Sequence, residues 1–260
     1  MNYADRYFLQ HYSTTAEVGL YSFGYNIAMV LNLIVTAVQM AWPAQMFAIA
    51  KKAGAEQHFS KILTYYVTIL GFIGLAFSVL APEALVIMTT PHFHRACTVV
   101  PLVALSYIFA GTMYMTNTGL ETQNKVKYMA PIIVVSAALN LGLNYLLIPP
   151  YGMMGAAFAT LISYLFLAVV NTAVNLHFWY IPYEYNRIAK IALAWGLIYG
   201  TSLLTRMPNV WLSGLLKLLL LGTYPLLLYV FRFYKDRELT RAQQVFQSGW
   251  SRVCAWRAGV

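Results

Sequence analysis

Long stretches without a single charged residue constrain the fold of this chain more than any other feature. Four of them cover residues 18–46, 62–82, 96–120 and 128–176. A helix needs about 20 apolar residues to cross the hydrocarbon of a bilayer, so the last stretch is long enough to cross twice. The sequence Pro149-Pro150-Tyr151-Gly152 predicts the break between the two crossings, because proline cannot continue a helix and glycine permits a turn.

Two further apolar segments complete a predicted set of seven membrane-spanning helices. The spans lie near residues 18–45, 60–81, 96–120, 128–148, 152–177, 187–205 and 210–231. Only 10% of the 260 residues are charged and 60% are hydrophobic, whereas an ordinary soluble domain has about 25% charged residues. The spans are apolar on all sides, unlike the alternating strands of a barrel. The predicted fold is therefore all-α, a polytopic transmembrane helix bundle.

The basic residues cluster in alternate loops between these spans. Thirteen of the seventeen fall on one predicted side: Lys51, Lys52, Lys61, Lys125, Lys127, Arg187, Lys190, Arg232, Lys235, Arg237, Arg241, Arg252 and Arg257. Arg6, Arg95, Arg206 and Lys217 fall on or near the other side. The positive-inside rule makes the richer side cytoplasmic, together with the C-terminus. Distributed in this way, the net charge of +9 indicates membrane orientation rather than nucleic-acid binding.

The two ends of the chain do not fit the pattern of complete spans. Residues 1–12 contain Asp5 and Arg6 within a short apolar stretch, and we expect them to be the tail of a truncated transmembrane helix. Residues 234–260 predict a cytoplasmic basic amphipathic tail, with Phe246, Trp250 and Trp256 at helical spacing. A frayed tail is the equally weighted alternative, since Gly249 interrupts the helical pattern.

The sequence contains no motif typical of an enzyme, a cofactor site or a metal site. It lacks a phosphate-binding glycine loop, a paired-histidine metal motif and a nucleophile elbow. His92 and His94 lie in a short loop without a third ligand nearby, and the two cysteines are predicted on opposite sides of the membrane. We therefore expect no catalytic residues, no cofactor, no metal and no disulfide.

Charged residues within spans are the first candidates for a functional role, because an intramembrane charge is costly. We expect Asp5, Arg6 or both to face a central aqueous cavity; a position near the water interface is the alternative. Lys217 is expected to extend its amine to the external interface. Glu83, Arg95 and Glu121 fall at predicted span ends and are expected to be exposed to solvent.

Polar side chains within spans form the second set of candidates for a substrate path. They are Tyr21, Tyr25, Asn26, Asn32, Gln39, Asn117, Asn140 and Asn144. Amides can bind sugar hydroxyls and tyrosines can stack on sugar rings, but for any single amide hydrogen bonding between helices is the favoured role. Asn140 and Asn144 share a helix face. Gly155, Ala159 and Ser163 form a stripe of small residues that predicts close helix contact.

Several of these segments together resemble a known family. DRYFL (residues 5–9) and EVGLYS (17–22) resemble the seventh and eighth helices of polysaccharide-biosynthesis (O-antigen, Wzx-like) flippases. These belong to the multidrug/oligosaccharidyl-lipid/polysaccharide (MOP) superfamily. LNLGLNYLLIP (139–149), YG (151–152) and GAAFAT (155–160) are similar to the eleventh and twelfth helices, and VVPL (99–102) to the tenth.

The resemblance implies the C-terminal lobe of a MATE-like transporter of fourteen helices. Residues 13–178 would be the five-helix remainder of that lobe, and residues 179–233 two additional C-terminal transmembrane helices. The implied activity is flipping of undecaprenyl-pyrophosphate-linked repeat units for O-antigen, capsule or exopolysaccharide in the bacterial inner membrane. Membrane lipids, a polymerase and the export machinery are implied partners. The family's Asp-Arg pair would be Asp5 and Arg6, with Arg6 receiving the pyrophosphate.

Three alternatives remain open at this point. The first is a lipid II flippase or a drug/cation antiporter of the same superfamily. The second is a membrane enzyme such as an O-antigen polymerase, although the short loops leave little room for a catalytic domain. The third is a membrane scaffold that binds partner proteins.

Overall fold

The computed structural model describes residues 2–205, 207–235, 238 and 240, and every regular element in them is helical. The elements, in chain order, are α1 (Asn2–Tyr12), α2 (Thr15–Ala50), α3 (Ala55–Met88), η1 (Pro91–Thr98), α4 (Val100–Thr116), α5 (Thr118–Thr122), η2 (Val126–Tyr128), α6 (Met129–Phe178), α7 (Tyr185–Leu204) and α8 (Val210–Val230). The predicted all-α bundle is confirmed.

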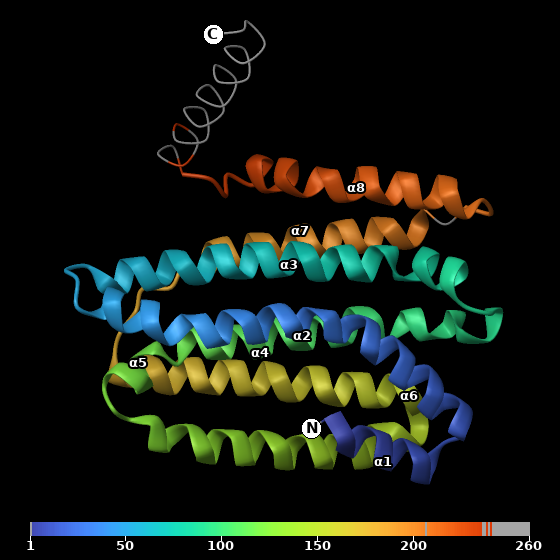
Figure 1. The fold of residues 1–260 in the computed structure, drawn as a ribbon, viewed down its shortest axis with the longest axis horizontal. Helices are drawn as coiled ribbons and strands as arrows, with labels where there is room; N and C mark the ends of the chain where they lie inside the picture. Colours follow the sequence, from blue (N-terminus) through green and yellow to red (C-terminus); the bar gives the residue numbers. More distant parts are fainter. Residues whose placement is uncertain (1, 206, 236–237, 239, 241–260) are drawn as a thin grey trace, which may run out of the picture.

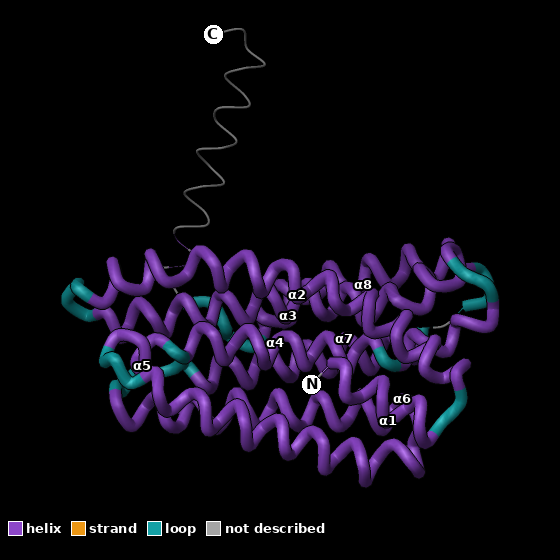
Figure 2. The backbone as a smooth tube through the Cα atoms, turned by 60° about the horizontal axis from the view of Figure 1, so that its bottom comes forward, coloured by secondary structure: helices purple, strands orange, loops and turns teal. Residues whose placement is uncertain are grey.

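The long helices lie side by side along one direction, with their connections at two opposite ends (Figures 1 and 2). α6 is two antiparallel arms rather than one rod, because Gly152 takes a non-helical conformation with φ 53° and ψ −132°. The hydroxyl of Ser136 on the first arm donates to the carbonyl oxygen of Ser163 on the second, at 2.8 Å. The break predicted at Pro149-Pro150-Tyr151-Gly152 is therefore confirmed.

Four helical stretches are long and apolar enough to cross a membrane: α2, α3, Val126–Phe178 and α8. η1 and α4–α5, which meet at a bend of 40°, together make a fifth. α7 packs along α3 and α8 (Figure 1) but is not among these stretches. Its membrane crossing stays a prediction.

Local signals in the sequence explain where the helices begin. The Thr14 hydroxyl accepts the backbone N–H of Glu17 at the start of α2, which satisfies a donor that the helix itself leaves unpaired. The Asn209 side chain accepts from two backbone N–H groups at the start of α8. α2 has 36 residues and is about 54 Å long at 1.5 Å per residue. It therefore extends beyond a hydrocarbon core of about 30 Å.

The small-residue stripe on α6 packs inside the α6 hairpin. A β-carbon added to Gly155 would lie 2.1 Å from the backbone oxygen of Leu147 on the other arm. Ala159 and Ser163 are both buried. The predicted close contact is confirmed, and the partner helix is the first arm of α6 itself.

The loops that carry most basic residues meet at one end of the bundle (Figure 1). The α2–α3 loop with Lys51 and Lys52, the segment with Lys125 and Lys127, the start of α7 and the end of α8 all lie at this basic end. Which side of the membrane the basic end faces remains a prediction. Arg206, Cys254, most of the predicted tail at 234–260 and its arginines Arg237, Arg241, Arg252 and Arg257 lie outside the described residues.

Candidate functional site

A buried carboxylate is the centre of the polar residues in the bundle interior. Asp5 is 0% exposed. Its Oδ2 accepts hydrogen bonds from the Tyr21 hydroxyl at 2.8 Å and from the Thr160 hydroxyl at 2.6 Å. Its Oδ1 accepts from the Asn144 side-chain amide at 2.7 Å. Three separate segments, α2 and both arms of α6, thus supply the donors that hold one side chain of α1.

The hydrogen bonds to Asp5 lie well inside the bundle, because the two arms of α6 that carry Asn144 and Thr160 fold back on each other at Gly152. Asn144 and Thr160 are each eight residues from this glycine, which places both about 12 Å from the turn along their arms. Asn140, one turn further along the first arm, accepts a 3.3 Å hydrogen bond from Asn144. This depth is within the apolar part of the spans, where a charge is retained only with partners or a function.

Three tyrosines and an arginine adjoin the carboxylate. The Tyr107 hydroxyl of α4 donates to the Tyr25 hydroxyl at 3.1 Å, and the rings of Tyr21 and Tyr25 are 5.6 Å apart. The Arg6 guanidinium carbon lies 5.9 Å from the centre of the Tyr25 ring, within the range of a cation–π contact. Arg6 makes no ion pair with any carboxylate of the described residues.

The cluster has more hydrogen-bonding capacity than its internal contacts use. The Nδ2 atom of Asn140, the Oδ1 atom of Asn144 and the Nε atom of Arg6 are buried without a partner among the described residues. Buried polar atoms in native proteins usually have partners, so these three atoms are free to bind a further group. Its carboxylate, amide and hydroxyl oxygens could take up a proton or a hard cation. No group of three or more acidic, histidine or cysteine side chains suits a metal in the described part of the chain.

The structure brings together six of the ten candidates chosen from the sequence: Asp5, Arg6, Tyr21, Tyr25, Asn140 and Asn144. Asn26 and Gln39 instead point outward from α2, and Asn32 is half-buried there. Asn117 is buried at the break between α4 and α5, next in sequence to Thr116, which accepts a hydrogen bond from Asn171. Asp5 itself is enclosed by protein, so the expected exposure to an aqueous cavity is not seen for it.

Sequence reasoning missed two members of the cluster. Thr160 was part of the resemblance but was not chosen, and Tyr107 was one tyrosine among twenty. Thr160 lies within the small-residue stretch of α6 next to Ala159. A lone hydroxyl on a tightly packed face was the available signal, because such a group needs a hydrogen-bond partner nearby.

The expectations for Lys217, Glu83 and Glu121 were wrong, since Glu121 is half-buried rather than exposed. Lys217 is only 2% exposed, and its ammonium lies 2.6 Å from Glu83 Oε1 of α3, whose side chain is 11% exposed. The Ser213 hydroxyl donates to the same oxygen at 2.7 Å. A buried charge that does not reach water needs a partner. Here Glu83, 134 positions earlier in the chain, supplies that acceptor within the bundle.

Comparisons with known proteins give one significant similarity. The chain is 26% identical over 185 residues to a Haloferax volcanii protein named "Probable low-salt glycan biosynthesis flippase Agl15". The similarity covers 67% of this chain and 38% of the relative, so the chain spans well under half of the relative's length. No family model matches the chain, and no solved structure matches it.

Proposed function

We propose that this chain is a membrane-spanning part of a flippase for lipid-linked glycans. The observation that carries the proposal is the similarity to a glycan biosynthesis flippase along 67% of the chain. A bundle of helices apolar enough to cross a membrane, with short connections between them, fits a transporter. Since only 38% of the relative is covered, the activity of a whole transporter would require further protein beyond what this chain supplies.

The more specific form of the proposal concerns substrate and setting. The resemblance of residues 5–9, 17–22 and 139–160 to O-antigen flippases favours an undecaprenyl-pyrophosphate-linked repeat unit, exported for O-antigen, capsule or exopolysaccharide. It also favours the bacterial inner membrane and the C-terminal lobe of a MATE-like fold. The gathering of basic loops at one end favours a cytoplasmic C-terminus. A polymerase and the export machinery are the proposed partners.

Within this proposal, the charge of the Asp5 cluster changes during transport. A buried carboxylate held by α1, α2 and both arms of α6 links four segments through three hydrogen bonds. A change in its charge, by a proton or a cation, alters all three bonds at once and so changes how the segments pack. Arg6 lies beside it and offers a guanidinium for the phosphate groups of a substrate.

A chimera tests the function directly. The matched region of the Haloferax volcanii relative is replaced by this chain, and glycan assembly is measured in a strain that lacks the relative. Restored glycan assembly is expected for the chimera. Asp5→Asn keeps the shape of the side chain but removes its charge, and we expect it to lose at least tenfold in glycan assembly at equal protein level.

Two controls keep the result interpretable. Asn26→Asp places a new carboxylate on the outward face of α2 and reports how much a charge elsewhere disturbs the protein. Membrane fractionation confirms that each chimera is inserted. If the parent chimera is inserted in the membrane but assembles no glycan, the proposed flippase function is wrong. If Asp5→Asn assembles as much glycan as the parent, the role proposed for the cluster is wrong.

A further inference from the structure

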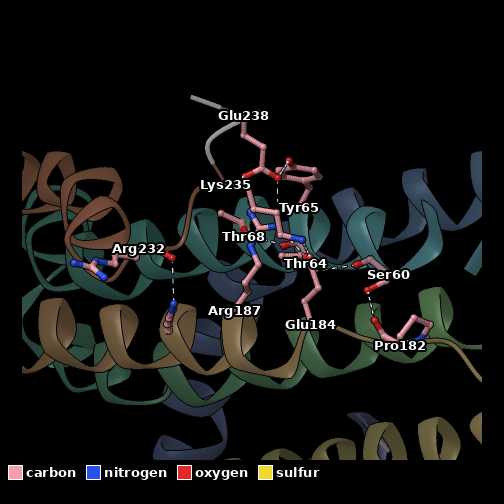
Figure 3. Close-up of polar contacts among 11 residues, drawn as sticks. Ser60, Thr64, Tyr65, Thr68, Pro182, Glu184, Arg187, Arg232, Lys235 and Glu238 are labelled. Atoms are coloured by element: carbon pink, nitrogen blue, oxygen red, sulfur yellow. Dashed lines mark hydrogen bonds and ion pairs between the residues drawn. The ribbon is translucent and has the colours of Figure 1, made fainter. Parts of the chain in front are cut away.

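A second group of charges, far from Asp5, binds the chain that follows α8. Figure 3 shows these residues at the level where α7 begins and α8 ends. Arg187 of α7 contacts Glu184 and Glu238, and Lys235 contacts Glu184. We call Glu184, Arg187, Lys235 and Glu238 the C-terminal clasp. Its four charges sum to zero, so the clasp is neutral as it stands.

The donors around Glu238 match the shape of a phosphate site. Arg187 donates to it through both terminal nitrogens, at 3.3 Å to Oε1 and 2.9 Å to Oε2. The Tyr65 hydroxyl of α3 also donates to Oε1, and the Lys235 backbone N–H donates to Oε2 at 2.9 Å. A guanidinium fork with a hydroxyl and a backbone N–H is a donor set that binds carboxylate and phosphate oxygens alike.

The arginine is fixed in place independently of Glu238. Its side chain is 7% exposed, and its guanidinium carbon lies 4.2 Å from the centre of the buried Phe233 ring. Glu184 holds one nitrogen at 2.9 Å. The Nε atom is buried without a partner among the described residues. A pre-oriented guanidinium with spare donors can receive a different anion without rebuilding the site.

Glu238 is held as an anion rather than as an acid. Burial alone would raise the pKa of its carboxyl, but the hydrogen bonds from Tyr65 and the Lys235 amide, with the charge of Arg187, outweigh burial and lower it. Removing this one anion would leave the remaining three groups with a net charge of +1. Nearby, the Lys190 ammonium donates to the Arg232 backbone carbonyl at 3.1 Å, whereas the Arg232 guanidinium points away from Arg187 (Figure 3).

We propose that Arg187 and Tyr65 form a binding site for a phosphate group, which Glu238 fills in this structure as an internal substitute. The site lies at the basic end of the bundle, beside the start of α7 and the end of α8. The headgroup phosphates of anionic lipids are found at the ends of membrane-spanning helices. A single phosphodiester charge balances the +1 that remains when Glu238 leaves. Binding would therefore exchange the Glu238 carboxylate for a phosphate, a role separate from the transport proposed above.

The test measures phosphate binding to the purified full chain in a non-ionic detergent. Native mass spectrometry follows titration with phosphatidylglycerol in one arm and with inorganic phosphate in the other. Glu238→Gln removes the internal anion, and we expect it to bind phosphatidylglycerol at least tenfold more tightly than the parent. Glu121→Gln is the matched control, because it changes the net charge equally at a half-buried position outside the clasp. Adding Arg187→Gln to Glu238→Gln should abolish the gain.

The outcomes separate the proposal from a purely structural ion pair. If Glu238→Gln gains no more affinity than Glu121→Gln in either arm, no phosphate site exists and the clasp only holds the chain. A gain in the lipid arm alone supports a headgroup ligand, and an equal gain with inorganic phosphate supports a soluble source. Should Glu238→Gln unfold, Glu238→Ala, which also removes the carboxylate, is judged by the same comparison. Loss of transport in the chimera would leave these binding results unaffected.

Discussion

Removing the charge of Lys217 should destabilise the protein strongly, although the residue lies on a helix predicted to span the membrane. Lys217→Met keeps a side chain of similar length and removes only the ammonium. In the parent this ammonium lies 2.6 Å from Glu83 Oε1, with 2% and 11% of the two side chains exposed. The substitution leaves a carboxylate in an apolar setting with Ser213 as its remaining donor.

The size of the effect follows from burial. Removing one partner of a buried ion pair typically costs about 3–5 kcal/mol, because the other charge stays buried without compensation. The bond from Ser213 persists, so we expect the lower end, about 3 kcal/mol. Glu83→Gln should cost a similar amount. The double substitution should cost about 3 kcal/mol rather than the sum of about 6, which is a coupling of about 3 kcal/mol.

Unfolding in mixed micelles, followed by tryptophan fluorescence as sodium dodecyl sulfate is added, measures these free energies. Lys61→Met is the control, since Lys61 is exposed on α3 and the same substitution there should change stability by no more than about 0.5 kcal/mol. If Lys217→Met costs no more than Lys61→Met, and the double substitution is additive, the ammonium reaches water instead of Glu83. The ion pair would then contribute nothing to stability.

Three further predictions concern other parts of the molecule. Gly155→Ala should cost at least about 2 kcal/mol in the same unfolding assay, since its β-carbon would meet a backbone oxygen at 2.1 Å. Gly142→Ala on the same helix has open space and should not destabilise the protein. The C-terminal clasp should hold above pH 4.5 and loosen as the pH falls further, because the pKa of both its carboxyls lies below the ordinary 4.5 in the folded protein. Limited proteolysis after position 235 measures this loosening. Cleavage that does not depend on pH would contradict the prediction. Lys52→Cys should not react with an impermeant thiol reagent added outside intact cells, whereas His92→Cys should react. Labelling at position 52 would show that the orientation is the opposite one.

The sequence was sufficient to predict the helices and the break in α6, because these depend on local properties. Uncharged length identifies a span, and two prolines followed by glycine identify the turn at Gly152. A crossing at residues 187–205 was also predicted, but two charges at the start of α7, Arg187 and Lys190, weaken the signal for it. Patterns within one segment therefore specified most of the fold.

Contacts between distant segments could not be predicted in the same way. Asp5 and Asn144 were both candidates because a polar group within a span is costly and is retained for a role. Nothing in the sequence predicted a contact between them across 139 positions. The same limit explains the error at Lys217, whose partner lies on α3. A single sequence shows that a buried charge must find a partner. Packing alone decides which partner it finds.

Because α6 turns at a single residue, Gly152, the number of residues between each donor and the turn fixes where that donor lies. Asn144 and Thr160 reach the same carboxylate because each stands eight positions from Gly152. One inserted residue between either of them and the turn would rotate that side chain by about 100° around its helix and shift it by about 1.5 Å. The hydrogen bond to Asp5 would then be lost, although every residue of the cluster would still be present. Chains that build this centre in the same way should therefore hardly vary in the number of residues between the two donors.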